Sequence, residues 1–219
     1  EHVASLGLDL PCDDHIQPTA ESPLSKPLDR ITLGGKTPGN RIAIHPMEGW
    51  DGTADGHATE PMIRRWRRFG ESGAKLIWGG EAMAVRFDGR ANPHQLIINN
   101  ETETDLVTLR EAVTIAHAER FGNTDDLLIG FQLTHSGRFC RPGPGGDLKP
   151  WIAYRHPILD AKFGIDSDDP IISDDEVKRL IEQFIGAAKI AHRVGVDFVD
   201  VKHCHGYLLH EFLTAKTRP

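Results

Sequence analysis

The side chains with the widest chemical range stand close together near residue 205, in Lys202-His203-Cys204-His205-Gly206-Tyr207-Leu208-Leu209-His210-Glu211-Phe212-Leu213. Lys202 and His205 are three residues apart at a predicted strand-to-helix turn, so both can direct a polar donor into one pocket. Tyr207 follows two residues later and can offer its phenol O–H as a general acid. The spacing therefore indicates a site that binds a polar group and transfers a proton.

Two other interpretations of this segment stay open. Its histidines and Cys204 are possible metal ligands, but the sequence has neither the His-x-x-x-His spacing of helical zinc sites nor a Cys-x-x-Cys pair. We therefore predict no metal site. Histidine and cysteine at a strand end are also often buried and hydrogen-bonded without a chemical role. Spacing alone does not separate that interpretation from the functional one.

Alternating strands and helices are predicted to position the segment. Strands are expected where apolar residues form short continuous runs, at 41–45, 75–78, 127–133 and 196–201. Helices are expected where apolar residues recur at helical spacing, at 59–69, 104–117, 173–191 and 206–214. Ser173 and Glu176 form a capping box at the start of the third helix. This alternation predicts an α/β fold whose parallel strands are buried on both faces.

The beginning of the chain follows another pattern. Residues 1–28 are polar and without periodicity, so we interpret them as an N-terminal arm that precedes a domain at 29–219. Two β-prone runs, at 30–33 and 41–45, flank a glycine-rich turn and predict a hairpin.

Polar side chains cluster where each predicted strand ends. In chain order they are His45 and Glu48, Glu81, Gln132 and His135, and Lys202 and His205. Ligands bind at this edge in open α/β sheets and in (β/α)8 barrels. A dinucleotide-binding Gly-x-Gly-x-x-Gly does not follow the first strand, and a Walker loop does not occur. A doubly wound nucleotide-binding sheet is therefore disfavoured.

Composition excludes several kinds of partner. The chain has 25 Lys and Arg against 32 Asp and Glu, a net charge of −7, which argues against binding to nucleic acid or to an anionic membrane. No run approaches the roughly 18 consecutive apolar residues of a membrane span. Three scattered cysteines and the lack of a signal-like start suit a cytoplasmic protein.

Five stretches of the chain carry a family resemblance. They read Asn40-Arg41-Ile42-Ala43-Ile44-His45-Pro46-Met47, Gly80-Glu81-Ala82-Met83-Ala84-Val85, Phe87-Asp88-Gly89-Arg90-Ala91-Asn92-Pro93, Gln132-Leu133-Thr134-His135-Ser136-Gly137-Arg138 and Val199-Asp200-Val201-Lys202-His203-Cys204-His205-Gly206-Tyr207-Leu208-Leu209. In content and in order they resemble the old yellow enzyme family of FMN-dependent oxidoreductases. The resemblance extends over about 180 of the 219 residues.

The resemblance implies a (β/α)8 TIM barrel, of which this chain holds roughly the first four β/α units after the N-terminal hairpin. Such enzymes pass a hydride from NAD(P)H through N5 of FMN to an activated alkene, such as an α,β-unsaturated carbonyl. The second half of the barrel, with its phosphate-binding region, is missing from the pattern. We expect the rest of a longer chain, a second chain or another copy to supply it, and the activity of the 219 residues alone is doubtful.

The resemblance also implies which residues hold FMN. By position, Gln132 would hydrogen-bond the pyrimidine edge of the flavin, because a side-chain amide both donates and accepts. Pro46, Met47 and Ala82 would contact the isoalloxazine ring. Glu48 stands where the family often has Thr or Cys, and a carboxylate there would lower the flavin's reduction potential unless it is protonated or turned away.

For the substrate, the resemblance implies that His205 and the residue at 202 hold the carbonyl oxygen, and that Tyr207 protonates the neighbouring carbon. Lys202 stands where the family usually has His, and it brings a full charge on a flexible stem. Either Lys202 selects an acidic substrate, or it points elsewhere and His203 or Cys204 takes part instead.

Several alternatives accompany these expectations. Three further motif residues, Glu81, His135 and Arg138, are expected to brace the scaffold. The chain is alternatively a relative that acts as an amine dehydrogenase or demethylase. A third alternative is a truncated barrel that binds partners but no flavin.

Overall fold

The computed structural model describes residues 5–7 and 20–218, and its central element is a parallel sheet of four strands in the order β1-β2-β3-β4. The strands are β1 (Ala43–Ile44), β2 (Leu76–Ala84), β3 (Leu128–Thr134) and β4 (Phe198–Val201). Each strand lies beside its predecessor in the sequence. All four carboxyl ends therefore meet at one edge of the sheet.

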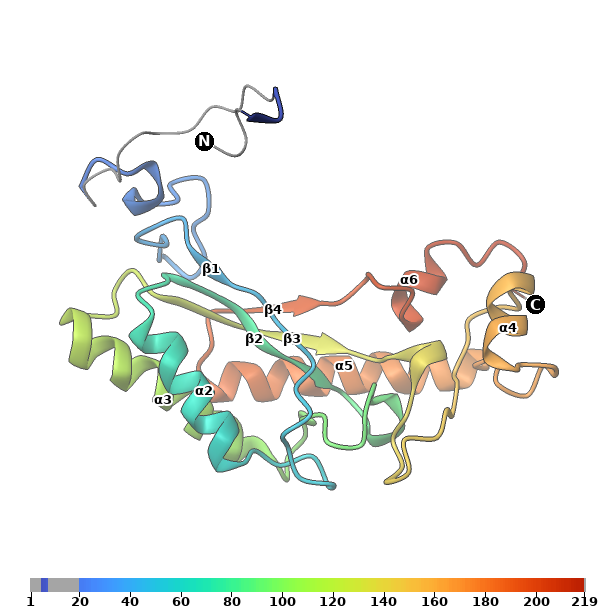
Figure 1. Ribbon diagram of the computed structural model, residues 1–219. Coiled ribbons are helices and arrows are strands. Elements are labelled where there is room, and N and C mark those ends of the chain that lie inside the picture. Colours follow the sequence, from blue (N-terminus) through green and yellow to red (C-terminus); the bar gives the residue numbers. More distant parts are fainter. Residues whose placement is uncertain (1–4, 8–19, 219) are drawn as a thin grey trace.

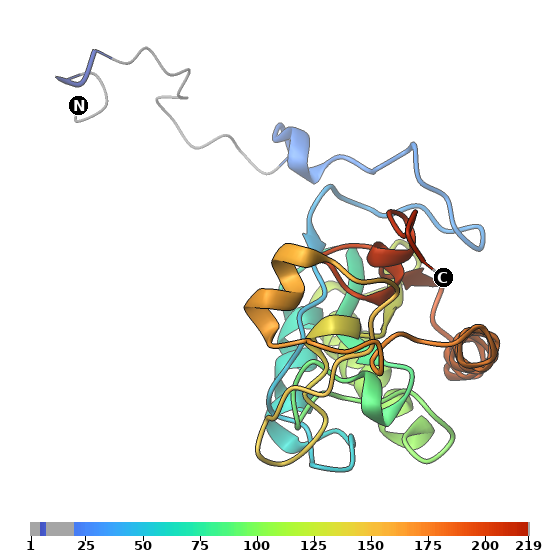
Figure 2. The same cartoon turned by 90° about the vertical axis from the view of Figure 1, so that its right-hand side faces the viewer.

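Three long helices cover one face of this sheet (Figure 1). They are α2 (Glu60–Glu71), α3 (Glu103–Phe121) and α5 (Asp174–Val194). In Figure 2 they form an arc around that side of the sheet. Two short helices, α4 (Pro157–Phe163) and α6 (Leu208–Phe212), lie together at the carboxyl edge of the strands. Single 3-10 turns occur at Pro23–Ser25, Phe87–Gly89 and Gly137–Phe139.

The hydrophobic core lies between the sheet and the long helices. Met62 and Trp66 of α2, Ile77 of β2, Leu109 of α3 and Phe131 of β3 are all fully buried. Burying a side chain of this size contributes about 1.5–3 kcal/mol. The core therefore holds β2 and β3 firmly against the helices, and these two strands carry Ala82 and Gln132 of the site described below.

β4 departs from the predicted burial. β2 and β3 are almost wholly buried, as the apolar runs predict, but β4 is partly exposed along its length. Val201 at its end and Ile181 and Ile185 of α5 are among the exposed hydrophobic side chains. The expectation that every strand is buried on both faces is therefore wrong for β4, because no described element packs beyond it.

A bulge in β2 shapes the carboxyl edge. The register between β2 and β3 shifts between Gly79 and Ala82, so that Ala82 lies opposite Gln132. Gly79 and Gly80 have φ values of 87° and 52°, a conformation that glycine adopts without a steric penalty. A Cβ on Gly80 would lie 2.8 Å from the ring of Trp66. Glycines therefore permit the bulge that aligns Ala82 with Gln132.

The predicted long helices and strands are confirmed, with ends that differ by up to four residues, except that β2 runs six residues beyond its predicted end. The capping box is half formed. The N–H of Glu176 donates to Oγ of Ser173 at 3.2 Å, but the Glu176 carboxylate accepts from Arg86 at 3.1 Å and pairs with Arg179. Salt bridges thus replace the expected return bond to the Ser173 backbone.

The predicted N-terminal hairpin is wrong. Leu33 pairs with Lys36 across a tight turn that Gly34 and Gly35 close, so the chain reverses before the second run begins. That second run forms β1, which pairs in parallel with β2, Ala43 opposite Leu76. Most of the predicted arm, at 1–4 and 8–19, lies outside the described residues. Its described part contains the 3-10 turn at Pro23–Ser25.

One helix was not predicted. α4 lies within the Gly- and Pro-rich stretch at 138–172, which shows no helical periodicity in the sequence. His156 caps its start by accepting the Leu159 N–H at 3.3 Å, Pro157 stands at its first turn, and Gly164 ends it with a φ of 66°. Capping residues rather than an apolar stripe define this helix, which is why periodicity does not reveal it.

Candidate functional site

The loops that follow the strands converge at the carboxyl edge of the sheet. The Ala82 N–H donates to the Met47 carbonyl at 3.1 Å, which ties the segment after β1 to β2. A Cβ on Gly79 would lie 3.0 Å from Cβ of both Pro46 and Gln132. Pro46 and Gln132 therefore approach each other across a residue without a side chain. The structure thus brings together four of the five predicted cofactor-binding residues: Pro46, Met47, Ala82 and Gln132.

Gln132 is held in one orientation by a partly buried acid, Asp200. Only 7% of Gln132 is exposed, and its Nε2 donates to Oδ2 of Asp200 at 2.7 Å. The indole N–H of Trp78 donates to the same oxygen at 3.0 Å. The carboxamide oxygen of Gln132 is left as an acceptor, because its nitrogen faces Asp200. Asp200 was not predicted as a site residue, although an acid inside an apolar strand is a signal that could have revealed it.

Lys202 and Glu48, the two residues that depart from the family pattern, pair with each other. Lys202 is 6% exposed, and its Nζ forms an ion pair with Oε1 of Glu48. The same Nζ lies 4.4 Å from the ring centroid of Tyr207. A buried ammonium group needs such compensation, because desolvation of an unpaired charge is costly. The structure therefore directs Lys202 into the site.

Tyr207 keeps its proton at neutral pH. Burial is the main cause that raises the pKa of its phenol above the ordinary value, and the negative charge of Glu48 raises it further. A phenol that stays protonated is a proton donor rather than a base. Its ring lies 5.7 Å from that of Phe139, between centroids.

His205 has an unusual backbone conformation. Its φ of 61° is the one positive value among the described residues other than glycine. Such conformations occur disproportionately at functional sites. Its Nδ1 lies 3.1 Å from Sγ of Cys204, its Nε2 has no hydrogen bond to the described residues, and its ring centroid lies 6.2 Å from that of Tyr207. His203 instead bonds the Val201 carbonyl through Nδ1 at 2.8 Å.

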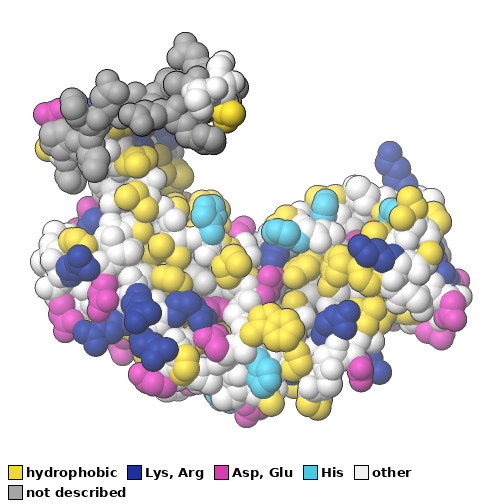
Figure 3. All heavy atoms as spheres, viewed as in Figure 1, with side chains coloured by type: hydrophobic (Ala, Val, Ile, Leu, Met, Phe, Trp, Pro, Cys, Tyr) yellow, Lys and Arg dark blue, Asp and Glu magenta, His cyan; other side chains and the backbone are white. Residues whose placement is uncertain are grey.

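The predicted residues His205 and Tyr207 line a cavity of about 440 Å³, whereas Lys202 is not part of its lining. Its lining residues are Glu48, Trp50, Ala91, Asn92, Phe139, Arg141, His205 and Tyr207. The space-filling view shows a hollow above the sheet, between the N-terminal segment and the end that carries α4 and α6 (Figure 3). Hydrophobic and histidine side chains are exposed around it. Neither Trp50 nor Arg141 was predicted, because both lie in loops with no chemical motif.

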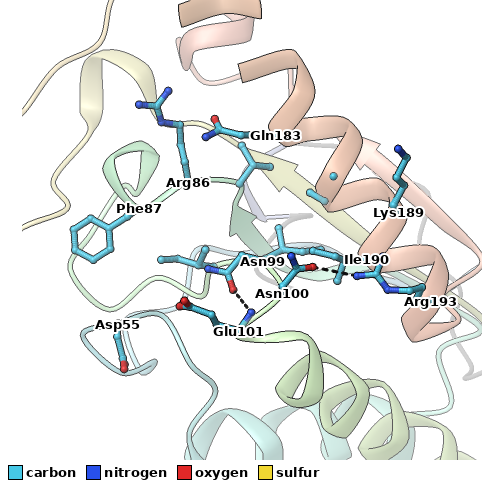
Figure 4. Close-up of a pocket in the computed structure, with 15 residues that line it drawn as sticks. Asp55, Arg86, Phe87, Asn99, Asn100, Glu101, Gln183, Lys189, Ile190 and Arg193 are labelled. Carbon is cyan, nitrogen blue, oxygen red and sulfur yellow. Dashed lines mark hydrogen bonds between the residues drawn. The ribbon is translucent and has the colours of Figure 1, made fainter. Parts of the chain in front are cut away.

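A larger cavity, of about 600 Å³, lies between α5 and the loop before α3 (Figure 4). It contains none of the predicted site residues. Arg193 of α5 bonds Asn100 at 3.3 Å and pairs with Glu103 at 2.6 Å. Arg86, the other arginine of this cavity, pairs with Asp88 and Glu176, so both arginines are occupied by protein partners. The smaller cavity is the candidate site because a proton donor and a strained histidine open into it.

Arg138 holds the elements around the site together, as predicted. It is fully buried, its Nε donates to Glu211 of α6 at 2.7 Å, and it pairs with Asp160 of α4. Glu211 also accepts the N–H of Ala153 at 2.8 Å. The network fixes the start of α6, which Tyr207 caps. Glu211 was not predicted to take part, although an acid on the apolar face of the predicted helix is a signal that could have revealed it.

Glu81 and His135 are also enclosed. Glu81 pairs with Arg65 and accepts the Gly49 N–H at 3.0 Å, and burial raises its pKa. Burial lowers the pKa of His135 to about 4. Its Nδ1 accepts the Gly137 N–H at 3.2 Å, so the imidazole is neutral at ordinary pH. Both side chains hold loops in place.

Within residues 5–7 and 20–218, no group of three or more His, Cys, Asp or Glu side chains is arranged to hold a metal ion. Nor is any helix of that part long and apolar enough to cross a membrane.

Residues 24–218 match the family model of the NADH:flavin oxidoreductase / NADH oxidase family. The chain belongs to this family. It is 26% identical to an NADH:flavin oxidoreductase of Gibberella zeae, over 93% of this chain and 50% of that protein. It is 30% identical to an NADPH dehydrogenase of Bacillus subtilis, over 84% of this chain and 50% of that protein. The chain thus spans about half the length of these relatives.

A solved structure supports the fold. The old yellow enzyme from Pichia sp. AKU4542 superposes with a TM-score of 0.69 at 22% identity, over 90% of this chain and 50% of that one. The predicted partial TIM barrel and the resemblance to old yellow enzymes are confirmed. The family and its relatives are oxidoreductases, and they imply FMN as the cofactor with NAD(P)H as the reductant.

The residues at the carboxyl edge fit the pyrimidine end of a flavin. The side-chain amide of Gln132 makes one hydrogen bond to the described residues, from its nitrogen to Asp200. Its carboxamide oxygen can therefore accept the N–H of the flavin ring. Pro46 and Ala82 border the same edge. The donor and acceptor set at this edge therefore agrees with the cofactor of the family.

Proposed function

We propose that this chain forms the N-terminal half of an FMN-dependent oxidoreductase that reduces an activated alkene, such as an α,β-unsaturated carbonyl, with NAD(P)H. One observation carries the proposal: the protonated phenol of Tyr207 and the imidazole of His205 open into one cavity. Glu48 lines that cavity and directly follows Met47, at the edge that fits a flavin. Proton donor, oxygen-binding group and cofactor edge are thus contiguous.

Five residues would hold the cofactor: Pro46, Met47, Glu48, Ala82 and Gln132. FMN, when bound, supplies the hydride chemistry. Gln132 would accept the flavin N–H, and Asp200 keeps the carboxamide turned for that bond. Glu48 is turned toward Lys202 and neutralised by it, which reduces the unfavourable effect of a carboxylate beside a reduced flavin.

The substrate side uses three residues. Nε2 of His205 and the remaining N–H groups of Lys202 would donate to the carbonyl oxygen, which withdraws electron density from the alkene. A hydride adds to the β-carbon, and the O–H of Tyr207 gives its proton to the neighbouring carbon. The ammonium of Lys202, 4.4 Å from the Tyr207 ring, stabilises the tyrosinate until water returns a proton.

The uncovered part of the sheet supports a second half of the barrel. β4 is partly exposed, and α5 presents Ile181 and Ile185 to solvent on its outer side. A further β/α unit packed there would cover both surfaces. We propose that the rest of a longer chain, or a second chain, supplies it, and that this half contributes the phosphate site. We also infer a cytoplasmic location from the scattered cysteines.

Flavin binding tests the proposal. The purified protein, with the polypeptide that completes its barrel, is expected to be yellow or to become yellow when FMN is added. Gln132→Leu should weaken FMN binding about fivefold, because one hydrogen bond is worth roughly 1 kcal/mol. The matched control is Gln183→Leu of α5, which lines the larger cavity and should leave FMN binding unchanged.

Two results would overturn the function. One is a colourless protein that cannot be reconstituted with FMN. The other is a flavin-loaded protein that NAD(P)H reduces but that no α,β-unsaturated carbonyl reoxidises faster than buffer alone.

A further inference from the structure

The charges around the 440 Å³ cavity are unevenly compensated. The carboxylate of Glu48 is paired with Lys202, so these two groups cancel. Arg141 is the other permanently charged side chain among the described lining residues, and it makes no ion pair there. The cavity therefore carries one uncompensated positive charge, in a chain whose net charge is −7.

Arg141 is held in place by its backbone. Its N–H donates to the Arg90 carbonyl at 2.8 Å, and Arg90 is itself fully buried and bonded to surrounding carbonyl groups. Nη1 of Arg141 donates to the Gly146 carbonyl at 2.7 Å. A guanidinium has five N–H donors, and this bond uses one of them. The remaining donors are available to a ligand in the cavity.

Three aromatic rings and Ala91 form the apolar part of the lining. Trp50, Phe139 and Tyr207 contribute aromatic rings, and Trp50 is 67% exposed. Asn92 offers little to a ligand, because its Nδ2 donates to Gly49 at 3.0 Å and its Oδ1 accepts from His94 at 2.9 Å. A planar body fits between such rings. Arg141 is then the group that can select for charge.

We propose that the acceptor is a flat, activated alkene that carries a carboxylate, and that Arg141 is the specificity-determining residue that binds this carboxylate. The planar guanidinium matches a carboxylate with two parallel hydrogen bonds, which a single ammonium cannot do. Lys202 does not fill this role, because Glu48 already neutralises it. The proposal rests on the proposed function and adds the substrate class.

Binding of a matched acid and ester tests it without turnover. The flavin-loaded protein is titrated by calorimetry with 3-benzoylpropionate and with its methyl ester, the saturated counterparts of an aryl enone acid and its ester. The wild-type protein should bind the acid at least tenfold more tightly than the ester. Arg141→Gln should remove this preference without changing the affinity for the ester, and Arg141→Lys should restore part of it. The control Arg64→Gln, which removes an exposed charge on α2, should leave the preference intact.

Turnover then separates the two proposals. With 3-benzoylacrylate and its methyl ester as acceptors, Arg141→Gln should raise KM for the acid at least tenfold and leave ester reduction unchanged. Equal affinity of the wild-type protein for acid and ester, no binding of the acid, or a preference that survives in Arg141→Gln would each overturn the role of Arg141. If the ester is reduced in those cases, the oxidoreductase function stands. If no acceptor is reduced, that function fails instead.

Discussion

Two clusters of charged residues lie at the same edge of the sheet and differ in how completely their groups are satisfied. In the brace around Arg138, the guanidinium bonds Glu211 at 2.7 Å and the Tyr154 carbonyl at 3.2 Å, and pairs with Asp160. Asp160 also accepts from Arg155 at 2.5 Å.

In the site, the described residues give the Lys202 ammonium one ion pair and the Arg141 guanidinium one hydrogen bond. A charged side chain whose hydrogen-bond donors are all bonded holds structural elements together, whereas one with unbonded donors can bind a ligand.

The largest expected effect comes from breaking the brace. Arg138→Leu leaves the buried Glu211 without its cation and Asp160 with Arg155 alone, which should lower the free energy of unfolding by about 3–5 kcal/mol. Arg141→Leu should change it by less than about 0.5 kcal/mol, as for a surface substitution. Urea unfolding of both variants measures the difference. Equal losses of unfolding free energy in the two variants would contradict the view that Arg138 stabilises the fold and Arg141 does not.

The second effect concerns His135, which belongs to the enclosed part of the edge. Its folded pKa of about 4 lies below the ordinary value of about 6.5. Its contribution to stability is therefore fully present above pH 6.5 and is lost as the pH falls toward 4. By linkage the loss amounts to about 3 kcal/mol.

Unfolding measured between pH 7 and pH 4 should show this loss in the wild-type protein, and a smaller one in His135→Gln. Parallel stability curves for the two proteins would refute the enclosed, neutral histidine.

A smaller effect is expected for the pair of Glu48 and Lys202, because Glu48 is partly exposed. Glu48→Gln should lower the free energy of unfolding by about 1–3 kcal/mol, since it leaves the buried ammonium without its charged partner. The double variant with Lys202→Met should recover most of that loss. A double-mutant cycle followed by thermal unfolding gives the coupling. Additive losses would mean that the two side chains do not interact.

The parts of the fold that the sequence predicts are those with a strong local signal. β2 and β3 are buried apolar runs, and α3 and α5 have regular apolar spacing, so each is visible in a short window of residues. The hairpin prediction failed because propensity identified two β-prone runs but not the tight turn at Leu33–Lys36. α4 was missed because its capping residues give too short a signal.

The site residues likewise divide into those with a local sequence signal and those without one. Tyr207 and His205 could be predicted, because the motif that contains them occupies one continuous segment. The pairing of Glu48 with Lys202 joins residues 154 positions apart, and that of Gln132 with Asp200 joins residues 68 apart. Such partners depend on the register of neighbouring strands, which no local pattern contains. Arg141 likewise becomes visible only when its loop lies beside the cavity.

The role of Tyr207 as proton donor is tested most directly by the two half-reactions of Tyr207→Phe, followed by the flavin absorbance. Reduction of the flavin by NAD(P)H should be unchanged, because that step needs no proton from Tyr207. Reoxidation by an enone should slow at least about 100-fold, the usual contribution of a general acid. Equal effects on both half-reactions, or no effect on reoxidation, would contradict the assignment of Tyr207 as the proton donor.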